Sequence, residues 1–180
     1  GCAPERIAAI TFTNKAAAEM RERLKGLIGR TAQKVIVCTF HALGVRMLRE
    51  DGAALGLKPN FSILDASDVL SLLKDCGGTT DAAVAKQWQW TISLWKNQGI
   101  TPEQALAASA ANEEHRSAAI VMQRYHERLT AYQSVDFDDL IGLPLKLLQN
   151  HADVREKWQR ALGHVLVDEY QDTNATQYEL

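Results

Sequence analysis

The amino-acid sequence predicts an α/β protein in which a parallel sheet is interrupted by an all-helical insertion. Short apolar runs typical of buried strands occur at Ile7–Phe12, Val35–Cys38 and His164–Asp168, near the two ends of the chain. From Asp65 to Gln133 the sequence shows only helical periodicity and no β-rich run. A strand pattern that stops and later resumes is the main evidence for an insertion.

Helices are expected directly after the first two strands. Asn14–Ile28 carries apolar residues at helical spacing, with Thr13 placed to cap its start and Gly29 to end it. Thr39 is placed to cap a second helix over Phe40–Arg49. This strand–helix–strand–helix order is typical of parallel α/β architecture.

Three regions follow from where the strand pattern stops and resumes. Residues 1–41 are assigned to the sheet domain, residues 42–135 to the helical insertion, and residues 136–180 to the return of the chain to the sheet domain. Inside the insertion, Thr101–Gln104 has Thr at the N-cap, Pro at the first helical position and Gln at the third, which is a capping-box pattern.

The composition is that of a folded protein with one domain or two small ones. Of 180 residues, 46% are hydrophobic and 23% are charged. The three cysteines are widely spaced and form no CxxC pair, which argues against a disulfide framework and a zinc site and fits a reducing cytoplasm. Because the chain starts at Gly1 and stops at Leu180 inside a helical pattern, we expect a fragment of a longer protein.

Charge is distributed unevenly along the chain. Residues 1–41 hold seven Lys and Arg against three Asp and Glu, whereas residues 136–180 hold four against nine. The basic start is suited to phosphates and the acidic end to a metal cation. Solvated protein surface explains both equally well, so charge alone leaves the choice open.

The strongest local pattern is the apolar strand Val165–Val167 followed by Asp168 and Glu169. An acid at the carboxyl end of a strand lies where open α/β sheets bind ligands. Such an Asp can hold the Mg²⁺ of a nucleotide, and the next Glu can orient or deprotonate the attacking water. As a bare pattern it is weak, because strands often end in acids for solubility.

Four segments together resemble the superfamily 1 DNA helicases of the Rep/UvrD/PcrA family, most closely those of the Rep type. Asp168–Thr173 (DEYQDT) resembles the family's motif II, Ile10–Met20 its motif Ia and Thr39–His41 its motif Ib. Asp136–Leu140 resembles the segment where the family's chain returns from an inserted helical domain. Its closely spaced acids raise the alternative of a metal cluster, but Asp136 and Asp139 fit the N-cap and third positions of a helix, so capping and a solvated face are expected instead. The four segments occur in the family's order, and the single departure noted is Ala18, where an Arg is usual.

The resemblance implies part of a RecA-like motor domain of the P-loop NTPase fold, with a helical domain inserted. It implies an ATP-dependent DNA helicase that translocates on single-stranded DNA in the 3′-to-5′ direction and separates the duplex, with ATP and Mg²⁺ as cofactors. By position, Asp168 would coordinate Mg²⁺ and Glu169 would act as the catalytic base. Gln171 would sense the γ-phosphate or the water, and Asp172 would support the motif.

The resemblance also implies a DNA-binding set on the first two motifs. These residues are Phe12, Thr13, Asn14, Thr39, Phe40 and His41. Phe12 would stack on a base, and the others would lie near the DNA backbone. Taken without the resemblance, the residues favour structural functions: Phe12 as a core residue, Thr13 and Thr39 as plain helix caps, and His41 as a structural histidine.

The sequence contains no GxxxxGK[ST] phosphate loop. We therefore expect the 180-residue chain to hold half of a nucleotide site and to be inactive alone. The alternative function is a non-enzymatic DNA-binding or interaction module that retains these motifs. The sequence does not distinguish roles in replication restart and repair.

Overall fold

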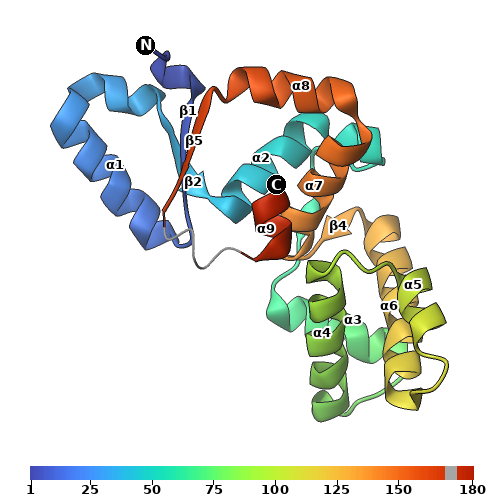
Figure 1. The fold of residues 1–180 in the computed structure, drawn as a ribbon. Coiled ribbons are helices and arrows are strands. Elements are labelled where there is room, and N and C mark those ends of the chain that lie inside the picture. Colours follow the sequence, from blue (N-terminus) through green and yellow to red (C-terminus); the bar gives the residue numbers. More distant parts are fainter. Residues whose placement is uncertain (169–173) are drawn as a thin grey trace.

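A computed structural model describes residues 1–168 and 174–180. Three strands form one parallel sheet in the order β2-β1-β5: β1 is Ile7–Thr11, β2 is Ile36–Thr39 and β5 is His164–Val167 (Figure 1). The prediction that three distant apolar runs share a parallel sheet is confirmed, and with it the α/β fold class.

The register brings the carboxyl ends of the three strands to one edge of the sheet. Thr11 pairs with Thr39, and Ile10 pairs with Val167. Beyond the last pair, the backbone N–H of Asp168 donates to the carbonyl oxygen of Ile10 at 2.9 Å. The residues that follow each strand therefore start from neighbouring positions.

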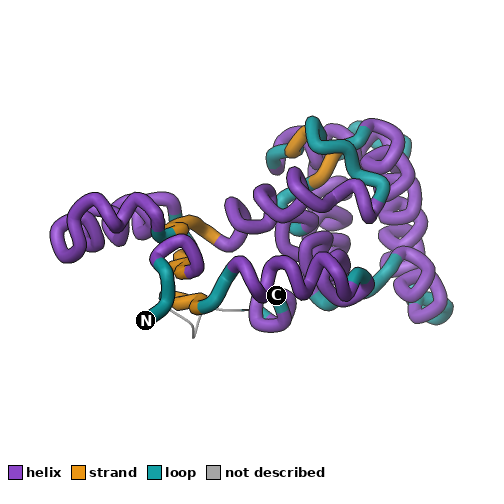
Figure 2. Tube along the Cα trace, turned by 90° about the horizontal axis from the view of Figure 1, so that it is seen from above, coloured by secondary structure: helices purple, strands orange, loops and turns teal. Residues whose placement is uncertain are grey.

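Helices cover both faces of this sheet. Helix α1 (Asn14–Ile28) covers one face, where Ala17 is buried with Ala9 and Val37. The other face is covered by α2, α7 and α8, and Figure 2 shows the strands lying between the two sets of helices. Those helices are Phe40–Asp51, Asp139–Asn150 and Ala152–Ala161.

The N-termini of α1 and α2 are capped as the sequence predicts. The hydroxyl of Thr13 accepts from the N–H of Ala16, and that of Thr39 accepts from the N–H of Ala42, both at 3.1 Å. Gly29 ends α1 with a φ of 61°, a backbone conformation that glycine adopts without steric cost. Short 3₁₀ turns lie at Pro4–Arg6, Gly29–Lys34 and Gly52–Leu55.

A group of four helices, which lies between β2 and β5 in the sequence and to one side of the sheet in space, has a core of its own (Figure 1). The helices are α3 (Ala66–Gly77), α4 (Ala82–Asn97), α5 (Pro102–Ala108) and α6 (Glu113–Tyr132). Both hydrogen bonds of the capping box predicted at Thr101 are present. None of the helices in the described part of the chain is both long and apolar enough to cross a membrane.

The chain enters and leaves this group through two short strands that the sequence did not predict. β3 (Ser62–Ile63) and β4 (Ser134–Val135) pair in parallel. They lie beside a small apolar cluster that includes Leu57, Phe61 and Leu140. A two-residue strand carries no periodicity, so its pairing depends on contacts between residues far apart in sequence.

The packing of α2 bears on where the helical insertion begins. Leu43 and Met47 of α2 belong to the same core as Ile10 of β1 and Trp158 of α8. The division into 1–41, 42–135 and 136–180 stays a prediction. The shared core favours a later start for the insertion, because it groups α2 with the sheet.

Helices α2 and α7 cross at very short range. A Cβ atom on Gly44 of α2 would overlap the carbonyl oxygen of Leu140 in α7. Pro144, one turn later in α7, has no N–H with which to bond that oxygen. Gly44 in α2 and Pro144 in α7 thus allow the backbones of the two helices to come into contact.

The close contact between Gly44 and the carbonyl oxygen of Leu140 can be tested by substitution. Gly44→Ala should lower the free energy of unfolding by about 1–3 kcal/mol or more, because the methyl group must displace main chain. Gly26→Ala in α1 is the matched control, since nothing lies within 4 Å of its Cβ position. It should raise stability by about 0.5–1 kcal/mol through helix propensity. Urea unfolding of both variants decides, and equal stability would contradict the close crossing.

Candidate functional site

Two aromatic residues meet at the carboxyl edge of the sheet. The rings of Phe12, after β1, and Phe40, after β2, have centroids 5.4 Å apart at 57°. Phe12 is half-buried, whereas Phe40 is 6% exposed and belongs to the core. Phe12 therefore has a supported ring with one part open to solvent. Any DNA contact of Phe40 is restricted to its main chain.

His41 lies beside an exposed aromatic ring. Its centroid is 6.3 Å from that of Phe137, with the rings at 78°, and Phe137 is 51% exposed. Burial lowers the pKa of His41, although Asp138 acts in the opposite direction. The imidazole is therefore neutral at pH 7 and offers hydrogen bonds rather than charge. Sequence reasoning missed Phe137; the available signal was an aromatic residue flanked by acids.

The remaining predicted DNA residues lie at helix starts. Thr13 and Thr39 use their hydroxyl oxygens as N-cap acceptors, which confirms the interpretation of both residues as helix caps. Asn14 is the first residue of α1 and is exposed. Helix N-terminal N–H groups are suited to phosphate oxygens, so capping and DNA contact are compatible at this edge.

Asp168 is the one residue of the predicted nucleotide site that the structure describes. It is exposed and directly follows β5 at the carboxyl edge. Glu169, Gln171 and Asp172 lie outside the described residues. No group of three or more His, Cys, Asp or Glu side chains able to hold a metal is found among residues 1–168 and 174–180. A single carboxylate fits Mg²⁺ that takes its other ligands from phosphates and water.

The acidic turn at Asp136–Asp139 is only partly as predicted. Its capping function is confirmed, because the N–H of Asp136 donates to Asp139 at 3.1 Å and the N–H of Asp139 donates to Asp136 at 2.9 Å. The prediction of a solvated face was wrong, since Asp136 is 5% exposed. Lys96 of α4 places Nζ 2.7 Å from both carboxylates, and the hydroxyl of Tyr125 donates to Asp136 at 2.6 Å.

This buried cluster shares one cation between two acids. Burial opposes the charge on Lys96, but Asp139 and Asp136 outweigh it and raise the lysine pKa. Burial raises the pKa of Asp139 to about 6 despite the pull of Lys96. Burial also raises the pKa of Asp136, but Lys96 and the hydrogen bond from Tyr125 outweigh burial and hold this pKa below the usual range. Asp139 is therefore the weaker acid of the two.

The same end of α4 reaches the helix that follows motif II. Asn97 donates from Nδ2 to Asp138 at 3.1 Å. Its carbonyl oxygen accepts from Thr176 at 3.4 Å, in α9 (Ala175–Glu179). Lys96 and Asn97 thus join the helical group to two segments of the sheet domain. Sequence reasoning missed both residues, because their partners lie about 40 and 80 positions away.

The three strands form a parallel α/β sheet and are followed by acidic and polar residues at one edge, the edge at which open α/β proteins generally bind ligands. Comparison with known proteins specifies the family. The family model for the UvrD/REP helicase N-terminal domain matches residues 1–180. This chain therefore belongs to the UvrD/REP helicase family, and its fold is part of that RecA-like domain.

Individual relatives agree with this assignment. The chain is 47% identical to the ATP-dependent DNA helicase Rep of Escherichia coli K12, over 100% of the chain and 27% of that protein. It is 46% identical to the ATP-dependent DNA helicase UvrD1 of Mycobacterium bovis, over 97% of the chain and 24% of that protein. It is 41% identical to the ATP-dependent DNA helicase Rep of Buchnera aphidicola subsp. Acyrthosiphon pisum, over 98% of the chain and 28% of that protein. The chain spans about a quarter of the length of these relatives.

The buried cluster predicts a large effect of removing its cation. Lys96→Met should lower the free energy of unfolding by about 3–5 kcal/mol, because Asp136 and Asp139 are left buried without a counter-charge. Lys86→Met is the matched control: it lies exposed on the same helix and should change stability by less than about 0.5 kcal/mol. Chemical denaturation of both variants at pH 7 is the measurement. Similar values for the two would show that the ion pair is not needed for stability.

Proposed function

We propose that this chain is part of the motor of an ATP-dependent DNA helicase, which moves 3′-to-5′ along single-stranded DNA and separates the duplex. The observation that carries the proposal is the meeting of three motif-bearing strands at one sheet edge. Asp168 follows β5 there, and the aromatic pair follows β1 and β2. Membership of a helicase family supports it.

On the nucleotide side, Asp168 would hold the Mg²⁺ that accompanies ATP. When bound, the cation neutralises charge on the transferring phosphate. Glu169 would orient and deprotonate the attacking water, and Gln171 would link the nucleotide to the DNA-binding edge. Asp172 would support the motif. The roles of the last three rest on the DExxQD pattern alone.

On the DNA side, the partially exposed ring of Phe12 is the proposed platform for a base. Stacking accepts any base, which suits a motor that moves along arbitrary sequence. His41, neutral and half-buried, would donate a hydrogen bond to the strand, with Phe137 beside it as a second exposed ring. Thr13, Asn14, Thr39 and the main chain of Phe40 would lie against the sugar–phosphate backbone.

The proposed activity requires more than this chain. The sequence holds no phosphate loop, whose backbone N–H groups and Lys hold the phosphates in such motors. Val165 and Leu166 of β5 are 50% and 62% exposed. Exposed apolar residues on a strand at the sheet edge favour further packing in the intact protein. We therefore expect the isolated chain to be inactive, and we place the intact helicase in the cytoplasm.

The alternative is a DNA-binding or interaction module without enzymatic activity. It predicts single-stranded DNA binding through the same edge and no ATP turnover in any context. A phosphate loop encoded directly upstream of Gly1 would decide for the motor.

The DNA-binding proposal is tested at Phe12. In the intact protein, Phe12→Ala should weaken binding to a single-stranded oligonucleotide by about 1–3 kcal/mol, because one stacked base loses its platform. Trp90→Ala is the control, since Trp90 is 64% exposed but lies on α4, away from the sheet edge. Fluorescence anisotropy at fixed salt gives both affinities. Equal losses, or none, would remove Phe12 from the proposed site.

The nucleotide proposal is tested at the acidic pair. In the intact protein, Glu169→Gln should keep ATP affinity but reduce hydrolysis about 10²–10⁴-fold, because the group that activates water is lost. Asp168→Asn should instead weaken the Mg²⁺-dependent step directly, because a carboxylate ligand of the cation is lost. Steady-state ATPase with single-stranded DNA and nucleotide titrations separate the two effects. Near-normal turnover in Glu169→Gln, or DNA-stimulated turnover by the 180-residue chain alone, would overturn the proposal.

A further inference from the structure

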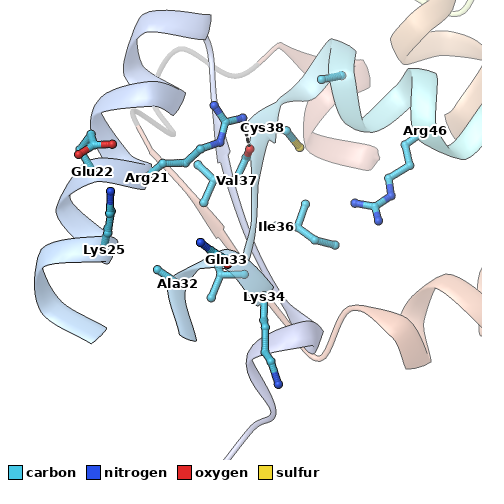
Figure 3. A pocket seen from close by; sticks show the side chains of 12 residues that line it. Arg21, Glu22, Lys25, Ala32, Gln33, Lys34, Ile36, Val37, Cys38 and Arg46 are labelled. Atoms are coloured by element: carbon cyan, nitrogen blue, oxygen red, sulfur yellow. Dashed lines mark hydrogen bonds between the residues drawn. The ribbon is translucent and has the colours of Figure 1, made fainter. Parts of the chain in front are cut away.

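The outer side of β2 borders a hollow of about 500 Å³ that the proposed function does not use. β2 is the last strand of the sheet and pairs only with β1 among the described strands. The hollow runs along β2 between α1 and α2 and is bounded at one end by the turn at Gly29–Lys34 (Figure 3). An edge strand of this kind is open to pairing with another extended segment.

Positively charged side chains border this hollow on both sides. Arg21 and Lys25 extend from α1 on one side of β2, and Arg46 extends from α2 on the other (Figure 3). Lys34 lies at one end and is already paired with Glu5 at 2.9 Å. Lys25 and Arg46 form no ion pair with any residue in the described part of the chain. Glu22 is the one acid among the residues that line the hollow.

One of these cations already contacts the strand. The guanidinium of Arg21 donates to the carbonyl oxygen of Val37 at 2.6 Å. The charged rim therefore lies directly against the backbone of β2 rather than at a distance from it. A strand that pairs with this carbonyl would displace Arg21 from it, and the freed guanidinium would remain beside the strand for an acidic side chain.

We propose that this hollow binds an extended acidic segment of a partner protein, which adds to the sheet as a strand beside β2. An added strand hydrogen-bonds through its main chain and directs successive side chains to opposite faces of the sheet. Neighbouring acidic residues would thus meet Lys25 and Arg21 on one face and Arg46 on the other. Charge complementarity on both faces selects an acidic strand over a neutral one.

A nucleic acid is the less suitable occupant. Lys25 and Arg46 would attract phosphates as readily as carboxylates. However, single-stranded DNA is held without sequence preference by aromatic side chains as well as by charge. None of the described residues that line the hollow is aromatic. The aromatic residues lie instead at the carboxyl edge, in the proposed DNA site.

The test uses the intact protein and labelled peptides. The probe is an eight-residue peptide that contains two adjacent glutamates among valine and threonine residues. One matched peptide carries glutamine in place of glutamate, and another carries proline at the central position to block strand pairing. We expect saturable binding of the acidic peptide and clearly weaker binding of both matched peptides.

Substitutions at the rim of the hollow test whether the peptide binds there. Lys25→Gln combined with Arg46→Gln should weaken the acidic peptide about three- to tenfold, as expected for two exposed ion pairs. Lys86→Gln combined with Arg116→Gln removes the same charge from exposed positions of the helical group and should leave peptide affinity unchanged. ATPase activity and the unfolding midpoint of each variant verify the fold.

Several outcomes would overturn the proposal. They are no binding of the acidic peptide, equal binding of the glutamine or proline peptide, and equal effects of the two double variants. If Lys25→Gln with Arg46→Gln weakens oligothymidylate but not the peptide, the hollow serves DNA instead. The Phe12 and Glu169 experiments are unaffected by these results, because helicase activity and peptide binding use different edges of the sheet.

Discussion

The close crossing of α2 and α7 is the constraint on which the rest of this structure depends. Gly44 lies against the carbonyl oxygen of Leu140, which Pro144 leaves without its usual helical donor. Helix α2 begins at the end of β2, and α7 begins where the chain returns from the helical group. One backbone contact therefore fixes the departing chain relative to the returning chain and keeps the helical group outside the sheet.

The second constraint is electrostatic and lies at the start of α7. Lys96 reaches out of the helical group to two carboxylates that also cap α7. Burying three charged groups is costly unless their geometry is good, and an apolar contact would give comparable stability without that cost. The charges also constrain how α4 lies on α7, because Lys96 Nζ lies 2.7 Å from both carboxylates. Asn97 extends this arrangement to Thr176, just after motif II.

The sequence predicted those parts of the fold that depend on local physics. The three strands, the bounds of α1, and the caps at Thr13, Thr39 and Thr101 follow from periodicity and hydrogen-bonding chemistry within a few residues. The pairing of β3 with β4 and the burial of the acidic turn depend on partners far along the chain, and no local pattern reports them. At the candidate site, Phe12 and Asp168 are predicted from motifs and stay predictions, whereas the contact of Phe137 with His41 is seen only in the fold.

The separate core of α3–α6 has a consequence for how such proteins diversify. Its buried side chains pack mainly against one another, and the chain enters and leaves at the neighbouring strands β3 and β4. A unit with adjacent ends and its own core can be lengthened, shortened or exchanged while the sheet persists. The condition is local: a replacement must return a cation to the carboxylates at the start of α7. The shape of the helical group can therefore vary while Lys96, Asn97 and Tyr125 keep the contacts that attach it to the sheet domain.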